Sequence, residues 1–135
     1  MTVRHHDLCF GCGQANLFGI QLELEPSDGG VAGRFFVKQD HQGPPGVGHG
    51  GIVATALDEA MALAVHAAGV RALTRRLEVE LRGPARVGSF VSLSAQITER
   101  SADRLVARAV AEGDEGEVLA QAVGHFAVVE SSVDS

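Results

Sequence analysis

Residues 41–69 read HQGPPGVGHGGIVATALDEAMALAVHAAG, and the rest of the chain can be interpreted from this segment. Its first part, residues 41–51, holds five glycines and two prolines, which excludes regular secondary structure there. Residues 52–68 contain neither Gly nor Pro and are dominated by Ala, Leu and Met. The composition of this second part predicts one long helix.

The predicted helix is apolar on nearly every side and is therefore expected to be buried on nearly every side. Its apolar surface is interrupted by only four residues, Thr55, Asp58, Glu59 and His66. A buried carboxylate costs several kcal/mol unless it is hydrogen-bonded or neutralised, which suggests a catalytic role for Asp58 or Glu59. Since adjacent residues lie about 100° apart around a helix, these two acids are not expected to share one role.

Composition narrows the class of protein. The 135 residues suit a single domain, residues 1–135, with one core. The net charge of -6, the pI near 5.4 and the absence of Trp and Tyr argue against nucleic-acid binding. The first residues lack an apolar signal core, and two acids in the middle of the apolar helix disfavour a membrane span. We therefore expect a cytoplasmic protein with no membrane or nucleic-acid partner.

The N-terminal segment, residues 1–19, contains a Cys-x-x-Cys motif at Cys9 and Cys12. His5 and His6 could complete four zinc ligands, but the second ligand pair that usually accompanies such a motif is missing. The sequence therefore favours a glycine-rich turn with small buried thiols, and neither a metal nor another cofactor is expected.

Alternating apolar and polar residues predict six strands. Two precede the helix and pair across a turn at residues 26–30. Four follow it, and the first of these places Leu77, Val79 and Leu81 on one face. The expected strands cover residues 20–25, 31–38, 74–82, 90–99, 105–112 and 118–129, and the polar tail from residue 130 is expected to fray.

Strand and helix patterns do not alternate along the chain, which excludes a doubly wound parallel sheet. An antiparallel sheet curled around the helix is the simplest way to bury the helix on so many sides. The predicted class is thus α+β. The exposed edges of a six-stranded sheet also favour a dimer formed by edge pairing.

The motifs resemble those of hotdog-fold acyl-CoA thioesterases, in particular the phenylacetate-pathway and thioesterase-superfamily-member branch. The matching residues are QGPPG at 42–46, His49-Gly50-Gly51 and Asp58 nine residues after the histidine. The CFGCG segment near the N-terminus and ELRGPARVG after the helix are also typical of that group. The resemblance implies a hotdog fold, hydrolysis of acyl-CoA without a metal, and a homodimer or homotetramer.

The resemblance also implies roles for four residues. The Gly51 amide would donate to the oxyanion, and Asp58 would be the general base or the nucleophile. His49 would either brace the glycine loop or contact the thioester carbonyl. Thr74 either holds the attacking water or is an ordinary strand residue. Some relatives carry Asn where this chain has Gly43, which argues against an amide side chain orienting water here.

Helix geometry adds a constraint on the site. Asp58 lies seven residues beyond Gly51, which is about 10 Å along a helix axis at ~1.5 Å per residue. A single thioester carbonyl cannot touch both groups when each must be ~3 Å from the reacting atoms. We therefore expect Gly51 of one subunit to act with Asp58 of another.

CoA carries phosphates, so cations are expected at the border of the site. The candidates follow the helix: Arg71, Arg75, Arg76, Arg82 and Arg86. Gly50, which has no side chain, would let the substrate approach the backbone. A non-catalytic acyl-CoA-binding protein or sensor on the same fold is the alternative, and a carboxylate at the reacting carbon favours the enzyme. A hydratase on this fold would need motifs that are not visible here.

Overall fold

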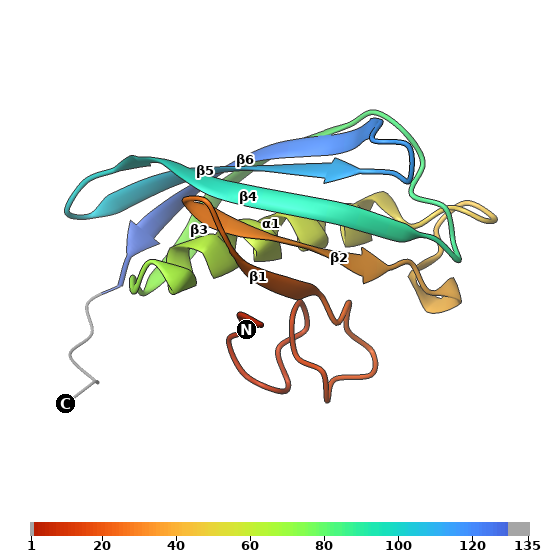
Figure 1. Ribbon diagram of the computed structural model, residues 1–135, viewed down its shortest axis with the longest axis horizontal. Helices are drawn as coiled ribbons and strands as arrows, with labels where there is room; N and C mark the ends of the chain where they lie inside the picture. The colour runs from red at the N-terminus through yellow and green to blue at the C-terminus, as the bar shows by residue number, and fades with distance from the viewer. Residues whose placement is uncertain (1, 130–135) are drawn as a thin grey trace.

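The structure is a computed structural model, and it describes residues 2–129. Its elements, in chain order, are β1 (Glu23–Ser27), β2 (Gly30–Phe36), a 3-10 turn (Gln39–His41), α1 (Gly50–Ala67), β3 (Ala72–Leu81), β4 (Phe90–Arg100), β5 (Arg104–Glu112) and β6 (Val118–Val128). The N-terminal loop segment, residues 2–22, contains no helix or strand and forms loops beside β1 (Figure 1).

The six strands form one antiparallel sheet in the order β1-β2-β4-β5-β6-β3. The sheet curves around α1, and the helix contacts every one of the six strands (Figure 1). This arrangement confirms the predicted α+β fold, an antiparallel sheet wrapped around one long helix.

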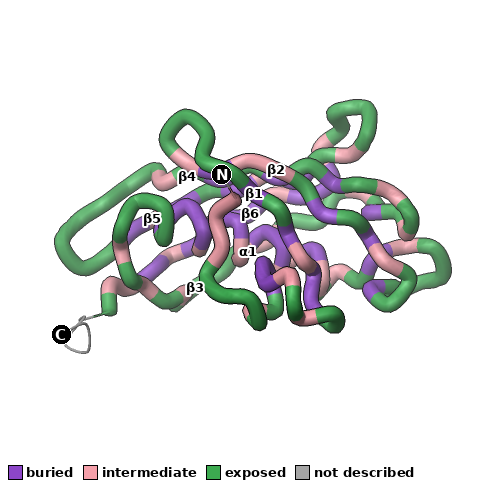
Figure 2. Tube along the Cα trace, turned by 60° about the horizontal axis from the view of Figure 1, so that its bottom comes forward, coloured by how far each residue is buried: buried purple, intermediate pink, exposed green. Residues whose placement is uncertain are grey.

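The core lies between the helix and the concave face of the sheet. From α1, Leu57 and Met61 are fully buried, and they meet buried side chains from the strands such as Phe35, Leu105 and Phe126. Buried residues follow the helix and alternate along the central strands, whereas the loops at both ends of the sheet are exposed (Figure 2). Removal of this apolar surface from water supplies the main driving force for folding.

The helix begins two residues earlier than predicted and ends one residue earlier. Gly50 and Gly51 belong to its first turn, although the glycine-rich composition had been taken to exclude regular structure up to residue 51. The first amides of a helix need no partner within it, and here the His49 side chain accepts from Gly51. The helix stops at Ala67 because Gly69 takes a left-handed conformation with φ of 79°.

β1 also differs from the prediction. It begins at Glu23 instead of Ile20 and runs to Ser27, and the turn shrinks to the two residues between the strands. Gln21 has a φ of 55°, which breaks the extended conformation before β1. Pro26 is tolerated in the strand because β1 is at the edge of the sheet, where one side needs no donor.

The other strand boundaries confirm the prediction to within two residues, but the expected apolar face of β3 is open. β3 is the second edge of the sheet, and it pairs only with β6. Leu73 is 65%, Leu77 38% and Leu81 54% exposed. Within the described residues these side chains are only partly covered, with Leu81 next to Gly50 at the start of α1, so an apolar strand edge faces the solvent.

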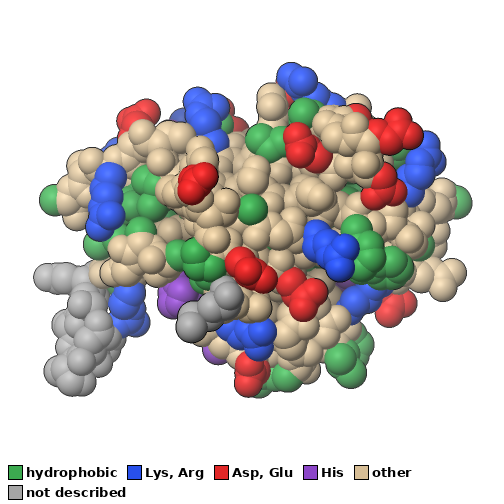
Figure 3. Space-filling view, viewed as in Figure 1, with side chains coloured by type: hydrophobic (Ala, Val, Ile, Leu, Met, Phe, Trp, Pro, Cys, Tyr) green, Lys and Arg blue, Asp and Glu red, His purple; other side chains and the backbone are tan. Residues whose placement is uncertain are grey.

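Charged groups of both signs are interspersed over the face shown in Figure 3, without a basic stripe. No helix within residues 2–129 has the length and apolar character needed to cross a bilayer. The tail predicted to fray, residues 130–135, lies outside the described residues.

The burial of Leu57 between the helix and the sheet leads to a prediction about stability. Leu57→Ala should lower the free energy of unfolding by about 2–5 kcal/mol, because it leaves a cavity between helix and sheet. Leu17→Ala, at a side chain that is 74% exposed, is the matched control and should change it by less than about 0.5 kcal/mol. Urea unfolding followed by circular dichroism measures both. Equal stability of the two variants would contradict the central position of the helix.

Candidate active site

Asp58 lies in the middle of α1 and faces the start of β3. Its side chain is half-buried, and the hydroxyl of Thr74 donates to Asp58 Oδ1 at 2.7 Å. Burial raises the pKa of Asp58 above its ordinary value, and the bond from Thr74 opposes that shift only in part. The two residues are sixteen positions apart in the sequence, so only the packing of α1 against β3 brings them together.

The Thr74 hydroxyl donates to only one of the two oxygens of the Asp58 carboxylate. Among the described residues, every buried side-chain oxygen and nitrogen has a hydrogen-bond partner, whereas no partner is found for Asp58 Oδ2. This oxygen is therefore accessible. Oδ2 can therefore accept a proton from a water molecule or approach an electrophilic carbon. A carboxylate with a raised pKa is also a stronger base, which suits it for general-base chemistry.

Glu59, the neighbouring acid, points to a different part of the molecule. Its Oε2 lies 2.8 Å from His5 Nδ1 in the N-terminal loop segment. Burial by itself would raise the pKa of Glu59, but hydrogen bonds with His5, Cys12 and Cys9 and the charge of His5 together outweigh burial and lower the pKa. Hydrogen bonds to Cys12 and Glu59 raise the pKa of His5 to about 11. The two adjacent acids thus have separate surroundings.

The first turn of α1 holds the other predicted catalytic group. His49 precedes the helix, and its Nδ1 accepts a hydrogen bond from the Gly51 amide at 2.8 Å. The predicted oxyanion donor is therefore engaged by a side chain, which must turn away before a substrate oxygen can bind there. His49 is exposed and free to do so. No acceptor is found within residues 2–129 for the amide of Gly50, next to it.

The loop before the helix is tightly packed at Gly43. A Cβ atom there would lie 2.9 Å from the Cα of His49, closer than real Cβ contacts come. The asparagine that some relatives carry at this position would force the loop to shift. The residue that departs from the family pattern therefore keeps His49 close to the loop.

Gly51 and Asp58 lie on one uninterrupted helix, Gly50–Ala67. Their separation along the axis is therefore the expected value of about 10 Å. Within one chain they cannot act on the same carbonyl, and the argument for a site shared between subunits stands as a prediction.

The five candidate arginines are not gathered in one place. Arg86 is nearest to the start of the helix, because its backbone bridges Val47 in the glycine-rich loop. Arg75 and Arg76 line a cleft of about 610 Å³ together with Arg104, which the sequence analysis did not select. Arg82, just after β3, pairs with Glu80 of that strand at 2.8 Å, and Arg71 lies beyond the opposite end of α1.

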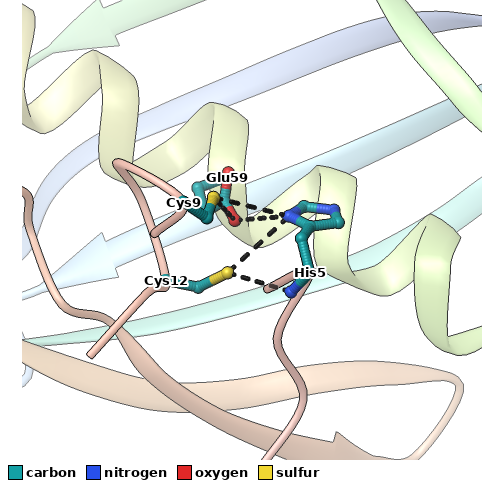
Figure 4. Close-up of side chains that lie close together, drawn as sticks. All are labelled: His5, Cys9, Cys12 and Glu59. Atoms are coloured by element: carbon teal, nitrogen blue, oxygen red, sulfur yellow. Dashed lines mark hydrogen bonds and ion pairs between the residues drawn. The ribbon is translucent and has the colours of Figure 1, made fainter. Parts of the chain in front are cut away.

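A second cluster of reactive side chains lies next to the helix. His5, Cys9, Cys12 and Glu59 place their ligand atoms within 4.8 Å of one another, a grouping able to hold a metal ion (Figure 4). The sequence pattern groups the cysteines with His5 and His6, but it does not connect Glu59 with them. His6 lies outside the cluster. The signal that could have identified Glu59 was its need for a partner on a buried helix.

Comparison with known proteins agrees with this architecture. The sequence profile of the thioesterase superfamily matches residues 45–120. A solved thioesterase superfamily protein superposes with a TM-score of 0.84 and 24% identity, over 90% of this chain. This chain spans 60% of the length of that protein. No curated protein matches the sequence significantly.

Two further solved structures show the same fold. A hypothetical thioesterase from Streptococcus pneumoniae TIGR4, with coenzyme A, has a TM-score of 0.75 and 18% identity over 80% of this chain and 85% of its own. It has also been crystallised as alanine variants of an aspartate and of a threonine sixteen positions later. The PaaI protein of the Escherichia coli phenylacetic acid degradation operon has a TM-score of 0.75 and 17% identity, over 80% and 83% of the two chains.

The contact between His49 and Gly51 predicts a capping effect. His49→Ala should lower the free energy of unfolding by about 1 kcal/mol, because the Gly51 amide loses its acceptor. His49→Asn keeps a side-chain acceptor near that amide and should retain most of the stability. Thermal and urea unfolding of both variants give the comparison. Equal losses in the two variants would show that the side chain does not cap the helix.

Proposed function

This chain belongs to the thioesterase superfamily, and we propose that it hydrolyses acyl-CoA thioesters to the free acid and CoA. The observation that carries the proposal is the half-buried carboxylate of Asp58, held by the hydroxyl of Thr74 at 2.7 Å with its other oxygen available. The streptococcal relative, crystallised with coenzyme A, supports CoA as the carrier. Its two alanine variants have the same sixteen-residue spacing as Asp58 and Thr74.

In the proposed reaction Asp58 acts at the thioester carbonyl, as the base for water or as the nucleophile. When it acts as the base, Oδ2 takes a proton from water while the water oxygen bonds to the carbonyl carbon. The carbonyl oxygen becomes an oxyanion, which the Gly51 amide stabilises after His49 has turned away. The oxyanion then re-forms the carbonyl, the carbon–sulfur bond breaks, and the CoA thiolate leaves and is protonated.

The proposed site requires a second copy of this chain. The open edge of β3, with the exposed Leu73, Leu77 and Leu81, is the surface along which two sheets can pair. Thr74 belongs to this strand, so the pairing would bring a partner subunit next to Asp58. The partner's glycine loop would then supply the oxyanion donor, and Arg86 beside that loop would face the phosphates of CoA.

Replacing the carboxylate tests the catalytic step. Asp58→Asn should lower kcat for acyl-CoA hydrolysis by about 10²–10⁴-fold with little change in KM, because the amide keeps the size but loses the base. Thr74→Val should lower kcat as well, and Thr74→Ser, which retains the hydroxyl, should retain most of it. The measurement is thiol release from a panel of aryl, short-chain and long-chain acyl-CoA esters.

Asp114→Asn, in the exposed turn before β6, is the matched control and should behave as the native chain does. Full activity in Asp58→Asn would overturn the assignment of this carboxylate. CoA esters that bind to the native protein without thiol release would instead favour the non-catalytic sensor.

The shared site can be tested by complementation. Gly51→Pro removes the proposed oxyanion amide, and Asp58→Asn removes the base, so each variant is expected to be inactive when alone. In mixed dimers one of the two sites receives both intact groups. Random pairing should then restore about one quarter of the native activity, and isolated mixed dimers should have about one half, as expected for a site built from two subunits of a symmetric dimer.

Circular dichroism of each variant checks that it is folded, and co-expression with two different tags isolates the mixed dimers. Mixed dimers that stay inactive would place both groups in the same subunit. Substantial activity of a proven monomer would overturn the shared site as well.

A further inference from the structure

We propose that His5, Cys9, Cys12 and Glu59 form a structural Zn²⁺ site that fastens the N-terminal loop segment to α1. The four residues come from two parts of the chain more than forty positions apart, and their side chains converge on one point (Figure 4). The proposal does not depend on the hydrolytic function, because it rests on a different set of side chains.

The spacing of the four ligand atoms is close to that of a zinc tetrahedron. Zn²⁺ bonds of about 2.1 Å to nitrogen or oxygen and about 2.3 Å to sulfur put neighbouring ligands about 3.4–3.8 Å apart. His5 Nδ1 lies 3.7 Å from each of the two sulfurs, and Cys9 Sγ lies 3.4 Å from Glu59 Oε2. The 2.8 Å pair of His5 and Glu59 must open slightly to admit the ion, and the widest pair of the cluster, within 4.8 Å, must close.

The types of ligand select the metal and its role. Two thiolates with an imidazole favour Zn²⁺ over the hard cations Ca²⁺ and Mg²⁺, which prefer oxygen. Four protein ligands also fill the tetrahedron and leave no position for water or substrate, which is the pattern of a structural site. Cys12 is fully buried, and the side chains of His5 and Glu59 are only 28% and 13% exposed.

The loop that carries the cysteines is shaped for this close approach. A Cβ on Gly11 would lie 2.3 Å from Glu59 Cγ, so only glycine lets the loop pack against the acid. A Cβ on Gly13 would lie 2.3 Å from the carbonyl oxygen of Asp7. The backbone amide of His5 also donates to Cys12 Sγ at 3.1 Å, a bond of the kind that stabilises a thiolate ligand.

The metal would add an anchor to the N-terminal loop segment, which already buries Ile20 and Leu22 in the core. The segment contributes no helix or strand, and one isolated bridge, Val3 to Leu24, joins it to the sheet. Several of its large apolar side chains are exposed, including Leu8, Leu17 and Phe18. A metal site joining two parts of a chain does not exist in the unfolded state, so metal binding contributes directly to the free energy of folding. In this site the metal would also fix Glu59, the residue next to Asp58.

Binding is accompanied by release of protons. Zn²⁺ replaces the protons of the Cys9 and Cys12 thiols and the proton that His5 Nδ1 shares with Glu59, whose carboxylate is already ionised. No electron is transferred, and the oxidation states of zinc and sulfur do not change.

The test is zinc itself, measured on the full-length chain purified without a metal-affinity step. We expect about one zinc per chain by atomic emission, released with a chromogenic chelator and restored by Zn²⁺ in reducing buffer. Replacing zinc with Co²⁺ should give thiolate charge-transfer bands and the intense visible absorption of a tetrahedral site. Removing the metal should lower the melting temperature.

Three variants locate the site. Glu59→Gln and Cys12→Ser should each weaken zinc binding by more than about 100-fold, beyond the 10- to 100-fold that loss of a supporting residue costs. His6→Ala is the matched control, because this exposed histidine adjoins His5 but lies outside the cluster, and it should bind zinc as the native chain does. The Co²⁺ spectrum of the unaltered chain tests the site even where a variant fails to fold.

Two results would overturn the proposal. The first is reduced native chain that takes up far less than one zinc per chain or gives no tetrahedral Co²⁺ spectrum. The second is zinc binding that survives in folded Glu59→Gln and Cys12→Ser. A disulfide between Cys9 and Cys12 in protein kept under reducing conditions would also overturn the proposal, because the pair would then be a redox group and not a pair of zinc ligands.

Discussion

Burial of the central helix α1 determines how the sheet is arranged around it. Apolar side chains cover α1 on nearly every side, and a flat sheet could bury only one of them. The sheet therefore curves around the helix so that all six strands contact it. The order of the strands follows from this requirement, because short hairpins connect β4, β5 and β6 while β3 closes the far side. Removal of apolar surface from water thus determines the architecture.

The few polar groups on this apolar helix each need a hydrogen-bond partner, and these partners determine where the two proposed sites lie. His49 accepts from the first turn, Thr74 donates to Asp58, and His5 pairs with Glu59. Adjacent acids on the helix point about 100° apart, so they face different neighbours. One acid belongs to the proposed catalytic site, and the other to the proposed zinc site. The same helix can therefore carry chemistry on one side and an anchor for the N-terminal loop segment on another.

The open edge at β3 connects fold and function. β3 exposes leucines along its length, and the proposed oxyanion donor and carboxylate lie about 10 Å apart on one helix. Pairing of two copies along β3 would cover these leucines and complete the proposed site at once. In the single chain the Gly51 amide donates to His49, so the proposed oxyanion donor is occupied by a side chain until a substrate replaces it.

The class of fold and the central helix can be predicted from sequence, because the absence of Gly and Pro in residues 52–68 and the alternation of the strands are local patterns. The predicted starts of β1 and α1 are wrong, since Gln21 takes a positive φ and a capping side chain lets glycines join the helix. The contact of Thr74 with Asp58 and the grouping of Glu59 with His5, Cys9 and Cys12 appear only in the folded chain. These contacts join residues far apart in the chain, and their geometry is fixed by packing, which no local pattern records.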